Sequence, residues 1–433
     1  MLRDPGAGAC DGAPTGRNRP VRNRSGYDPA MASFTDPLPL ARALIAAESV
    51  SRNSNAAAAA LCEEALTEIG FAVERTVYRD PRGMEKTNLL ARLAPSANAA
   101  SPRESSGFVW LGHTDTVPAN DWTGPGDDSS PGAPFTPVVT ADRLYGRGAC
   151  DMKGPVACAI SAAARLVESG EPRNAPLWIG LTADEEVGFE GAKELVAASE
   201  RYHELQTVNP PGILGEPTSL TAVHAHKGSH LLTAVARGVA GHSSTTEGEN
   251  ANLKLIPFLA DLLPLIERTD SDPTLHNAEF DPPGLSWNLT LSDGGTVLNV
   301  FPEKATATVY SRPTPQVDDG PLVQAFHDLA AKHGLESIDD RHAGPFHTDA
   351  DGDYPRAVRE LLGQAESRTV CYGTDGGVFA GPTEHGGGGL TNLLVLGPGD
   401  IAQAHTADEY IALHQLTRGA EVYETLFRHY CTA

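Results

Sequence analysis

One stretch decides the fold: Phe108-Val-Trp-Leu-Gly-His-Thr-Asp-Thr-Val-Pro118, in which a short apolar strand runs into a histidine and an aspartate. The arrangement recurs where Leu177-Trp-Ile-Gly-Leu181 precedes two glutamates, and where Gly212-Ile-Leu214 precedes Glu216. An amphipathic helix is expected between the first two strands, over residues 155–168. Strands that alternate with helices indicate an α/β fold with a mainly parallel sheet and helices on both faces. Open sheets of this kind bind ligands at the carboxyl ends of their strands, where these polar residues lie.

A different pattern follows about Gly228. Strands are expected at residues 231–237, 285–291 and 305–310, and helices at 252–266 and 321–333. This order is typical of a compact, ferredoxin-like α+β unit of the β-α-β-β-α-β kind. Because 433 residues exceed one ordinary core, two domains are expected.

The composition excludes several classes of protein. A net charge of −23 argues against nucleic-acid binding, which favours a basic surface. No run approaches the roughly 18 apolar residues of a membrane helix, so no membrane partner is expected. The six cysteines are scattered and predict free thiols in a reducing, cytoplasmic compartment. Residues 1–30 lack the apolar core of a secretory signal, and we expect a disordered tail with Met31 as the true translation start.

Seven acidic and histidine side chains in five short segments suggest a two-metal hydrolytic site: His113, Asp115, Asp151, Glu185, Glu186, Glu216 and His405. Imidazole and carboxylate ligands suit zinc and its divalent neighbours, and a bridging carboxylate can hold two ions about 3.5 Å apart. One carboxylate must stay off the metals to move protons, and adjacent Glu185 and Glu186 can divide these tasks. Asp115 is placed to hydrogen-bond the His113 imidazole. Asp151 precedes a helix, so an N-cap is its alternative role.

In these segments the chain resembles the dinuclear zinc deacylases and exopeptidases, a family that includes acetylornithine deacetylase, succinyl-diaminopimelate desuccinylase, aminoacylase and glutamate carboxypeptidase. The resemblance runs from about Ser49 to Tyr410, in the family's order. Three stretches are most similar to acetylornithine deacetylase: residues 49–55, 143–148 and 397–410. The resemblance implies a catalytic domain built from residues 31–228 and 345–433, interrupted by a lid and dimerisation domain at residues 229–344.

The resemblance also implies the metal ligands. One zinc ion takes His113, Asp151 and Glu216, and the other takes Asp151, Glu186 and His405, with Co²⁺ or Mn²⁺ able to substitute. Glu185 becomes the general base, Asp115 a catalytic residue that orients His113, and Asp184 receives no role. A cis peptide is expected between Asp151 and Met152.

Further roles follow from the resemblance in the lid and the late catalytic segments. His242, in Gly241-His-Ser-Ser244, is expected to reach the partner's active site in a homodimer and stabilise the oxyanion, the alternative being an ordinary surface histidine. Arg312 is expected to clamp a substrate carboxylate, although Tyr310 occupies the usual aspartate position. Asn299 is a candidate contact to the substrate amide. Thr374 and Gly376 are expected to line the acyl pocket. His224 and His226 are expected to pack beneath the lid hinge rather than to bind a third metal.

The expected function is metal-dependent removal of an acyl group from an N-acyl amino acid, as in arginine biosynthesis. Glu185 would take a proton from the attacking water and return it to the leaving amine. Acetylornithine deacetylases more typically carry Glu-Ala where Asp375 and Gly376 follow Thr374, so a desuccinylase, dipeptidase or carboxypeptidase is the alternative. A non-catalytic binding module with the same fold is the alternative from another class.

Overall fold

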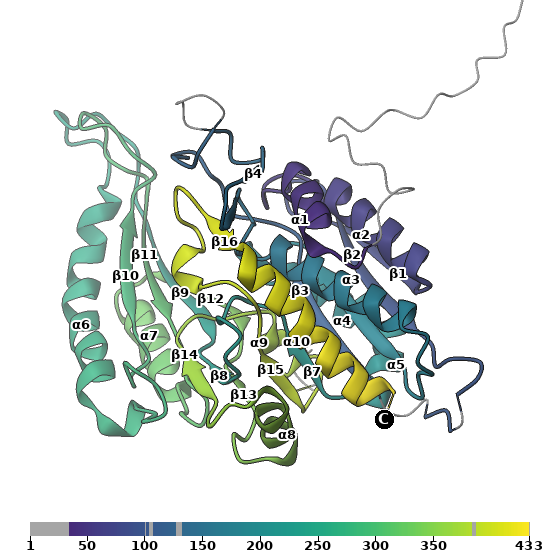
Figure 1. The fold of residues 1–433 in the computed structure, drawn as a ribbon. Helices are drawn as coiled ribbons and strands as arrows, with labels where there is room; N and C mark the ends of the chain where they lie inside the picture. The colour runs from purple at the N-terminus through teal and green to yellow at the C-terminus, as the bar shows by residue number, and fades with distance from the viewer. Residues whose placement is uncertain (1–33, 100, 104–106, 127–131, 383–386, 433) are drawn as a thin grey trace, which may run out of the picture.

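The computed structural model describes residues 34–99, 101–103, 107–126, 132–382 and 387–432. The tail expected at residues 1–30 lies outside the described residues. Figure 1 shows a large body, in which a sheet lies between helices, and a smaller unit beside it that contains α6, α7 and β9–β12.

The large sheet has the strand order β1-β2-β6-β3-β7-β15-β8-β13, and β14 pairs with β8. Its centre, from β6 to β15, is parallel. Both edges contain antiparallel pairs: β1 with β2 and β2 with β6 at one edge, and β15 with β8 and β8 with β13 at the other. Its strands are β1 Ala72–Arg79, β2 Glu85–Leu93, β3 Phe108–His113, β6 Leu177–Thr182, β7 Gly212–Leu214, β8 Val223–His226, β13 Phe346–His347, β14 Arg368–Val370 and β15 Leu393–Val395. The expected mainly parallel sheet is confirmed, and the antiparallel strands at its two edges are an addition that the apolar runs did not indicate.

Helices cover both faces of this sheet, as expected (Figure 1). One face packs against α1 Pro37–Ala46, α2 Ala56–Ile69, α3 Lys153–Glu168, α8 Asp353–Leu362 and α10 Leu413–Cys431. The other packs against α4 Glu190–Ala198, α5 Glu200–Val208 and the short α9 Gly376–Phe379. Trp110 points into the first core, and its neighbours Val109 and Leu111 point into the second. Burial on both faces explains why residues 108–111 of β3 are all apolar instead of alternating.

The smaller unit has a second, antiparallel sheet of order β10-β11-β9-β12. Its elements are β9 Ser229–Arg237, α6 Ala251–Ser271, β10 Asn288–Ser292, β11 Lys304–Ser311, α7 Gly320–Lys332 and β12 Glu336–Ala343. This is the expected β-α-β-β-α-β order, with its own apolar core between the sheet and the two helices. The strand expected at 285–291 begins only at Asn288, because Leu285 and Trp287 turn into that core instead. We keep the name lid for residues 229–344.

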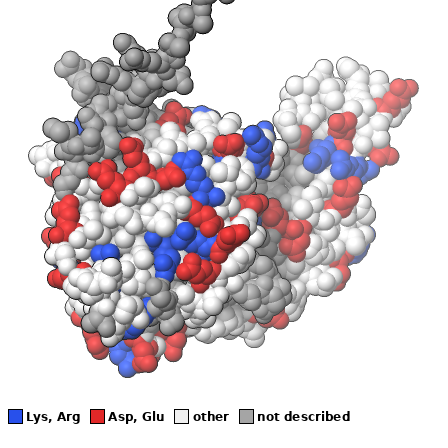
Figure 2. Space-filling model, turned by 90° about the vertical axis from the view of Figure 1, so that its right-hand side faces the viewer, with Lys and Arg blue, Asp and Glu red and all other residues white. Residues whose placement is uncertain are grey.

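Shorter elements complete the chain. A third sheet joins β4 Val138–Val139, β5 Arg143–Tyr145 and β16 Tyr410–Ala412, and so brings the C-terminal segment beside residues 143–151. The 3-10 turns η2 Glu185–Val187, η3 Pro273–Leu275 and η5 Ile401–Gln403 lie in connections. No helix in the described part of the chain is both long and apolar enough to cross a membrane. Figure 2 shows acidic and basic side chains interspersed on one face of the molecule.

Candidate active site

Five segments meet at the carboxyl ends of the central strands. His113 ends β3, Glu186 lies in η2 after β6, and Glu216 follows β7. Asp151 comes from the loop before α3, and His405 from the segment after η5. The structure therefore brings together all five side chains that are expected to bind metal, although His113 and His405 are 292 residues apart in the sequence.

These side chains form two groups that share Asp151: His113, Asp151 and Glu216, and Asp151, Glu186 and His405. Within each group the ligand atoms lie within 4.8 Å of one another. Oδ1 of Asp151 lies 3.1 Å from His113 Nε2, and its Oδ2 lies 3.4 Å from His405 Nε2. His405 Nε2 is also 3.0 Å from Glu186 Oε2. Asp151 thus offers one oxygen to each group, the arrangement that a carboxylate bridging two ions requires. The peptide between Asp151 and Met152 is cis, as expected.

The charges of this cluster fit divalent cations. Burial, reinforced by neighbouring carboxylates, raises the pKa values of Glu185, Glu186 and Glu216. Hydrogen bonds to Asp151 and Glu186 raise the pKa of His405 to about 10. Burying so many acids beside two imidazoles is costly unless cations neutralise them. Imidazole and carboxylate donors of this number and spacing suit zinc and similar ions.

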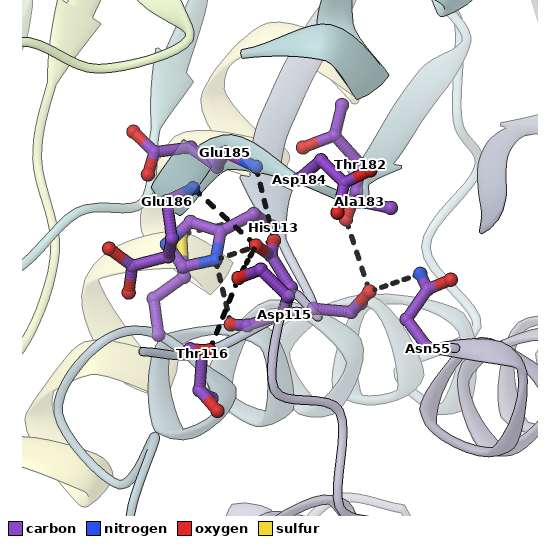
Figure 3. A network of polar contacts seen from close by, with 12 residues as sticks. Asn55, His113, Asp115, Thr116, Thr182, Ala183, Asp184, Glu185 and Glu186 are labelled. Atoms are coloured by element: carbon purple, nitrogen blue, oxygen red, sulfur yellow. Dashed lines mark hydrogen bonds and ion pairs between the residues drawn. The ribbon is translucent and has the colours of Figure 1, made fainter. Parts of the chain in front are cut away.

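Asp115 connects two of the ligand segments (Figure 3). Its Oδ1 lies 3.4 Å from His113 Nδ1, while the carbonyl oxygen of Asp115 lies 3.1 Å from the same nitrogen. The Asp115 carboxylate also accepts hydrogen bonds from the backbone N–H groups of Glu185 (3.2 Å) and Glu186 (3.4 Å). The His-x-Asp spacing predicts the contact between the Asp115 carboxylate and the His113 imidazole. It did not predict the hydrogen bonds from the Glu185 and Glu186 N–H groups. The catalytic role of Asp115 stays a prediction.

Glu185 lines a cavity of about 340 Å³ and belongs to neither ligand group. The cavity is also lined by Arg312 and Thr374, and by four of the five candidate ligands, Asp151, Glu186, Glu216 and His405. His113 lies beneath them, 1% exposed. A carboxylate beside the ligands, yet outside both groups, is free to transfer protons.

Arg312 packs over the ring of Tyr310, its Cζ 4.5 Å from the ring centroid. Tyr310, at the position expected to hold an aspartate, therefore contacts the guanidinium by stacking. The Tyr310 hydroxyl lies 3.0 Å from Ser229 Oγ, and all three residues line the cavity. Arg312 Nη1 also lies 3.5 Å from the carbonyl oxygen of Gly228. Its contact with a substrate carboxylate stays a prediction.

Thr374 also lines the cavity, and Gly376 lies behind it. Thr374 Oγ1 lies 3.0 Å from His226 Nε2 and accepts a hydrogen bond from the backbone N–H of Gly376. His224 and His226 are both buried on β8, which ends just before the lid begins, and His226 stacks on Phe346.

His242 and Asn299 lie on a projection of the lid, which we call the lid arm and define as residues 238–250 and 293–303. A bridge pairs His242 with Val300, and Ser243 N–H donates to the Asn299 carbonyl. Figure 1 shows the arm extending beyond the end of α6, at the upper left. Neither residue lines the cavity of its own chain, so the structure places this pair apart from the other candidates.

Two of the buried acids near the site, Asp184 and Asp375, were assigned no role from the sequence. Asp184 accepts hydrogen bonds from the buried Lys86 ammonium and, at 2.9 Å, from the Tyr78 hydroxyl. Asp375 accepts a 2.6 Å bond from Thr182 Oγ1, and burial raises its pKa to about 7. A lysine inside the strand 85–93 was the one available signal, because a buried ammonium needs an anionic partner.

Comparison with known proteins adds sequence and fold relatives. The model of peptidase family M20/M25/M40 matches residues 109–429. The chain is 32% identical over 420 residues to the acetylornithine deacetylase of Myxococcus xanthus, covering 92% of this chain and 99% of that protein. It is 31% identical over 414 residues to the acetylornithine deacetylase of Proteus mirabilis, covering 91% and 96%. An M20 family metallo-carboxypeptidase from Sulfolobus solfataricus has a similar fold, with a TM-score of 0.65, 17% identity, and coverage of 90% and 98%.

Proposed function

The chain belongs to peptidase family M20/M25/M40, which makes it a metal-dependent amidohydrolase, and we propose on that premise that it removes the acyl group from an N-acyl amino acid. One observation carries the proposal. Two groups of ligand atoms share Asp151 at a cavity that also holds Glu185 and Arg312. Such a cavity offers metal ligands, a proton-transfer group and a cation for a substrate carboxylate in one place.

We propose two zinc ions per chain, which Co²⁺ or Mn²⁺ can replace. His113, Asp151 and Glu216 would hold one ion, and Asp151, Glu186 and His405 the other. Bound there, the ions would supply Lewis acidity to the scissile carbonyl and to the attacking water. Asp115 would fix the tautomer and the orientation of the His113 imidazole.

Glu185 would carry the proton between the two halves of the reaction. Its carboxylate would accept a proton from water as the water attacks the amide carbonyl carbon. The protonated carboxyl would then deliver that proton to the leaving nitrogen, which departs as the free amine.

Substrate recognition would begin with the α-carboxylate at Arg312, whose planar guanidinium can bind both oxygens. Thr374 and Gly376 would border the acyl group. Asn299, like His242, would act from the lid arm. The deacetylase relatives support acetylornithine as substrate and a place in arginine biosynthesis. We propose a cytoplasmic location on the same ground, and the free cysteines among the described residues agree with it.

We further propose a symmetric dimer formed through the lid. His242 is absent from the cavity lining of its own chain, yet an oxyanion donor must lie about 3 Å from the reacting oxygen. A partner's lid arm would bring His242 to the cavity, and a two-fold contact would complete both sites equally. Exposed apolar residues on α6 and β10 support a contact surface on the lid.

A substrate panel tests the proposed activity. The zinc- or cobalt-loaded protein is given N-acetylornithine, N-succinyl-diaminopimelate and simple dipeptides, and kcat/KM is measured for each. The proposal expects the acetylated amino acid to be hydrolysed fastest. A preference for the succinylated substrate or for dipeptides would select the alternative activity in the same family. Absence of turnover with both ions bound would leave the non-catalytic binding module.

A further inference from the structure

Glu409, four residues after His405, has no role in the reaction described above, yet it is 0% exposed beside the metal ligands. Its Oε1 accepts hydrogen bonds from the backbone N–H groups of Cys150 (2.8 Å) and Asp151 (3.0 Å). Its Oε2 accepts one from the N–H of Gly148 (3.0 Å). Gly148 has a φ of 86°, a left-handed conformation that favours glycine, and it shapes the turn that directs these N–H groups at one carboxylate.

Arg147 completes the contacts of this carboxylate. Its Nη1 lies 2.6 Å from Glu409 Oε2, with both side chains at most 3% exposed. Its Nη2 donates to the carbonyl oxygen of Thr406 at 3.0 Å. A buried carboxylate held by a guanidinium and three N–H groups is firmly oriented, because each lost bond would leave a buried charge unpaired.

These contacts tie together two segments that each carry a candidate ligand. Glu409 holds the backbone of the 147–151 loop, which ends at Asp151. Arg147 holds Thr406, the residue that follows His405. The backbone of His405 has a strained, left-handed φ of 63°. Pairing of β16 with β5 fastens the same two segments farther along. Arg147 and Glu409 thus connect the backbone N–H of Asp151 with the carbonyl group of Thr406, next to His405.

We infer that Arg147 and Glu409 are positioning residues for the ion that Asp151, Glu186 and His405 would hold. The inference rests on the two-ion centre of the proposed function. Asp151 belongs to both ions, but the other two ligands of the second ion are His113, at the end of β3, and Glu216, after β7. Among the described residues, neither has a hydrogen bond or ion pair to Arg147 or Glu409. Loss of the Arg147–Glu409 contacts should therefore lower the affinity for the ion held by Asp151, Glu186 and His405 more than the affinity for the other ion. An ion pair that served the fold alone would change protein stability and leave the ratio of the two metal affinities unaltered.

In the experiment, Co²⁺ is titrated into the metal-free protein in the absence of substrate. Isothermal titration calorimetry measures the heat of binding, and visible absorption follows the spectrum of the bound Co²⁺. The variants are Arg147→Lys, which keeps the charge but loses the forked contact to Glu409 and Thr406, and Glu409→Gln, which puts an amide N–H where an acceptor is needed. Glu424→Gln is the control, because Glu424 pairs with Arg428 on α10 away from the ligands. A His405→Ala titration identifies the binding step that belongs to the Asp151, Glu186 and His405 group.

In Arg147→Lys and Glu409→Gln, affinity at that step falls roughly 10–100-fold, the other step changes much less, and the Co²⁺ spectrum shifts. Glu424→Gln matches the wild type. Two unchanged affinities, or an equal loss at both steps that follows a drop in Tm of the metal-free protein, would overturn the inference. Should Glu409→Gln fail to fold, Arg147→Lys decides alone. If the wild-type protein binds two ions but hydrolyses no substrate in the panel, the proposed activity is refuted. The effect of the variants on Co²⁺ affinity would still test the positioning role of Arg147 and Glu409.

Discussion

The acidic run 184–186 shows how the backbone gives three adjacent carboxyl groups three different surroundings. Asp184 has a φ of 55° and turns toward Lys86. Glu186 faces His405, and Glu185 lines the cavity without joining a ligand group. Because the residue before η2 is left-handed, successive side chains point apart instead of forming one solvated acidic patch.

Replacing Glu185 by Gln keeps the shape of the side chain but removes the group that accepts the proton. We expect kcat to fall by ~10²–10⁴-fold, the contribution that a general acid-base group typically makes. The loss should be larger if Glu185 serves in both proton transfers. Both ions should stay bound, as elemental analysis would show. Glu190→Gln, on α4 and paired with Lys193, is the control and should keep full activity. Near-normal turnover in Glu185→Gln would refute the proposed proton transfer.

His226 gives a pH-dependent prediction. Burial lowers its pKa from 6.5 to about 4. Between these values the unfolded chain takes up a proton that the folded protein does not, so the free energy of unfolding falls as the pH drops from 6.5 to about 4. The full contribution, about 3 kcal/mol, is present above pH 6.5. Urea denaturation at several pH values should show a shallower pH dependence for His226→Gln than for the wild type. Equal slopes would contradict the assignment.

At the scale of elements, α6 has two apolar faces but only one apolar core to meet. Leu255, Phe258 and Leu262 pack into the lid core. On the other side Leu253, Ile256 and Leu263 are each more than half exposed. The outermost strand β10 exposes Leu291 as well. Exposed apolar residues grouped on a helix and an edge strand mark a surface suited to a protein partner.

Introducing charge on this surface should separate the proposed dimer. Ile256→Glu with Leu263→Glu is expected to shift the mass measured by light scattering from dimer to monomer, because two carboxylates would be buried at the contact. Turnover should fall with it, since each site would lose the partner's His242. Ala331→Glu, at an exposed position of α7, is the control. A variant that stays dimeric would exclude this surface as the contact.

At the scale of the whole molecule, the proposed site is shared between two chains, and a mixing experiment addresses that arrangement. Glu185→Gln chains and His242→Ala chains are each expected to be inactive. After subunit exchange, half of the sites in each mixed dimer should combine an intact Glu185 with an intact partner His242, so partial activity should return. Mixed dimers that form but remain inactive would show that His242 does not act across the contact.

The sequence alone determined the features that local pattern encodes. Apolar runs such as residues 108–111 and 177–181 predicted the central strands, because strands buried on both faces need continuous apolar side chains. The change of periodicity after Gly228 predicted the order of elements in the lid. The three-residue strands β14 and β15 escaped prediction, because a run of three residues has no periodicity to read. The equally short β7 was predicted only because it precedes Glu216 as the other strands precede their polar residues.

Only the tertiary structure decided which distant residues share a contact. Arg147 and Glu409 are 262 residues apart, and Lys86 and Asp184 are 98 apart, so no spacing along the chain could pair them. Local sequence sets the preference of each segment for helix or strand. The packing of sheets and helices sets which buried charges meet, because a buried charge is tolerated only where the fold brings it a partner.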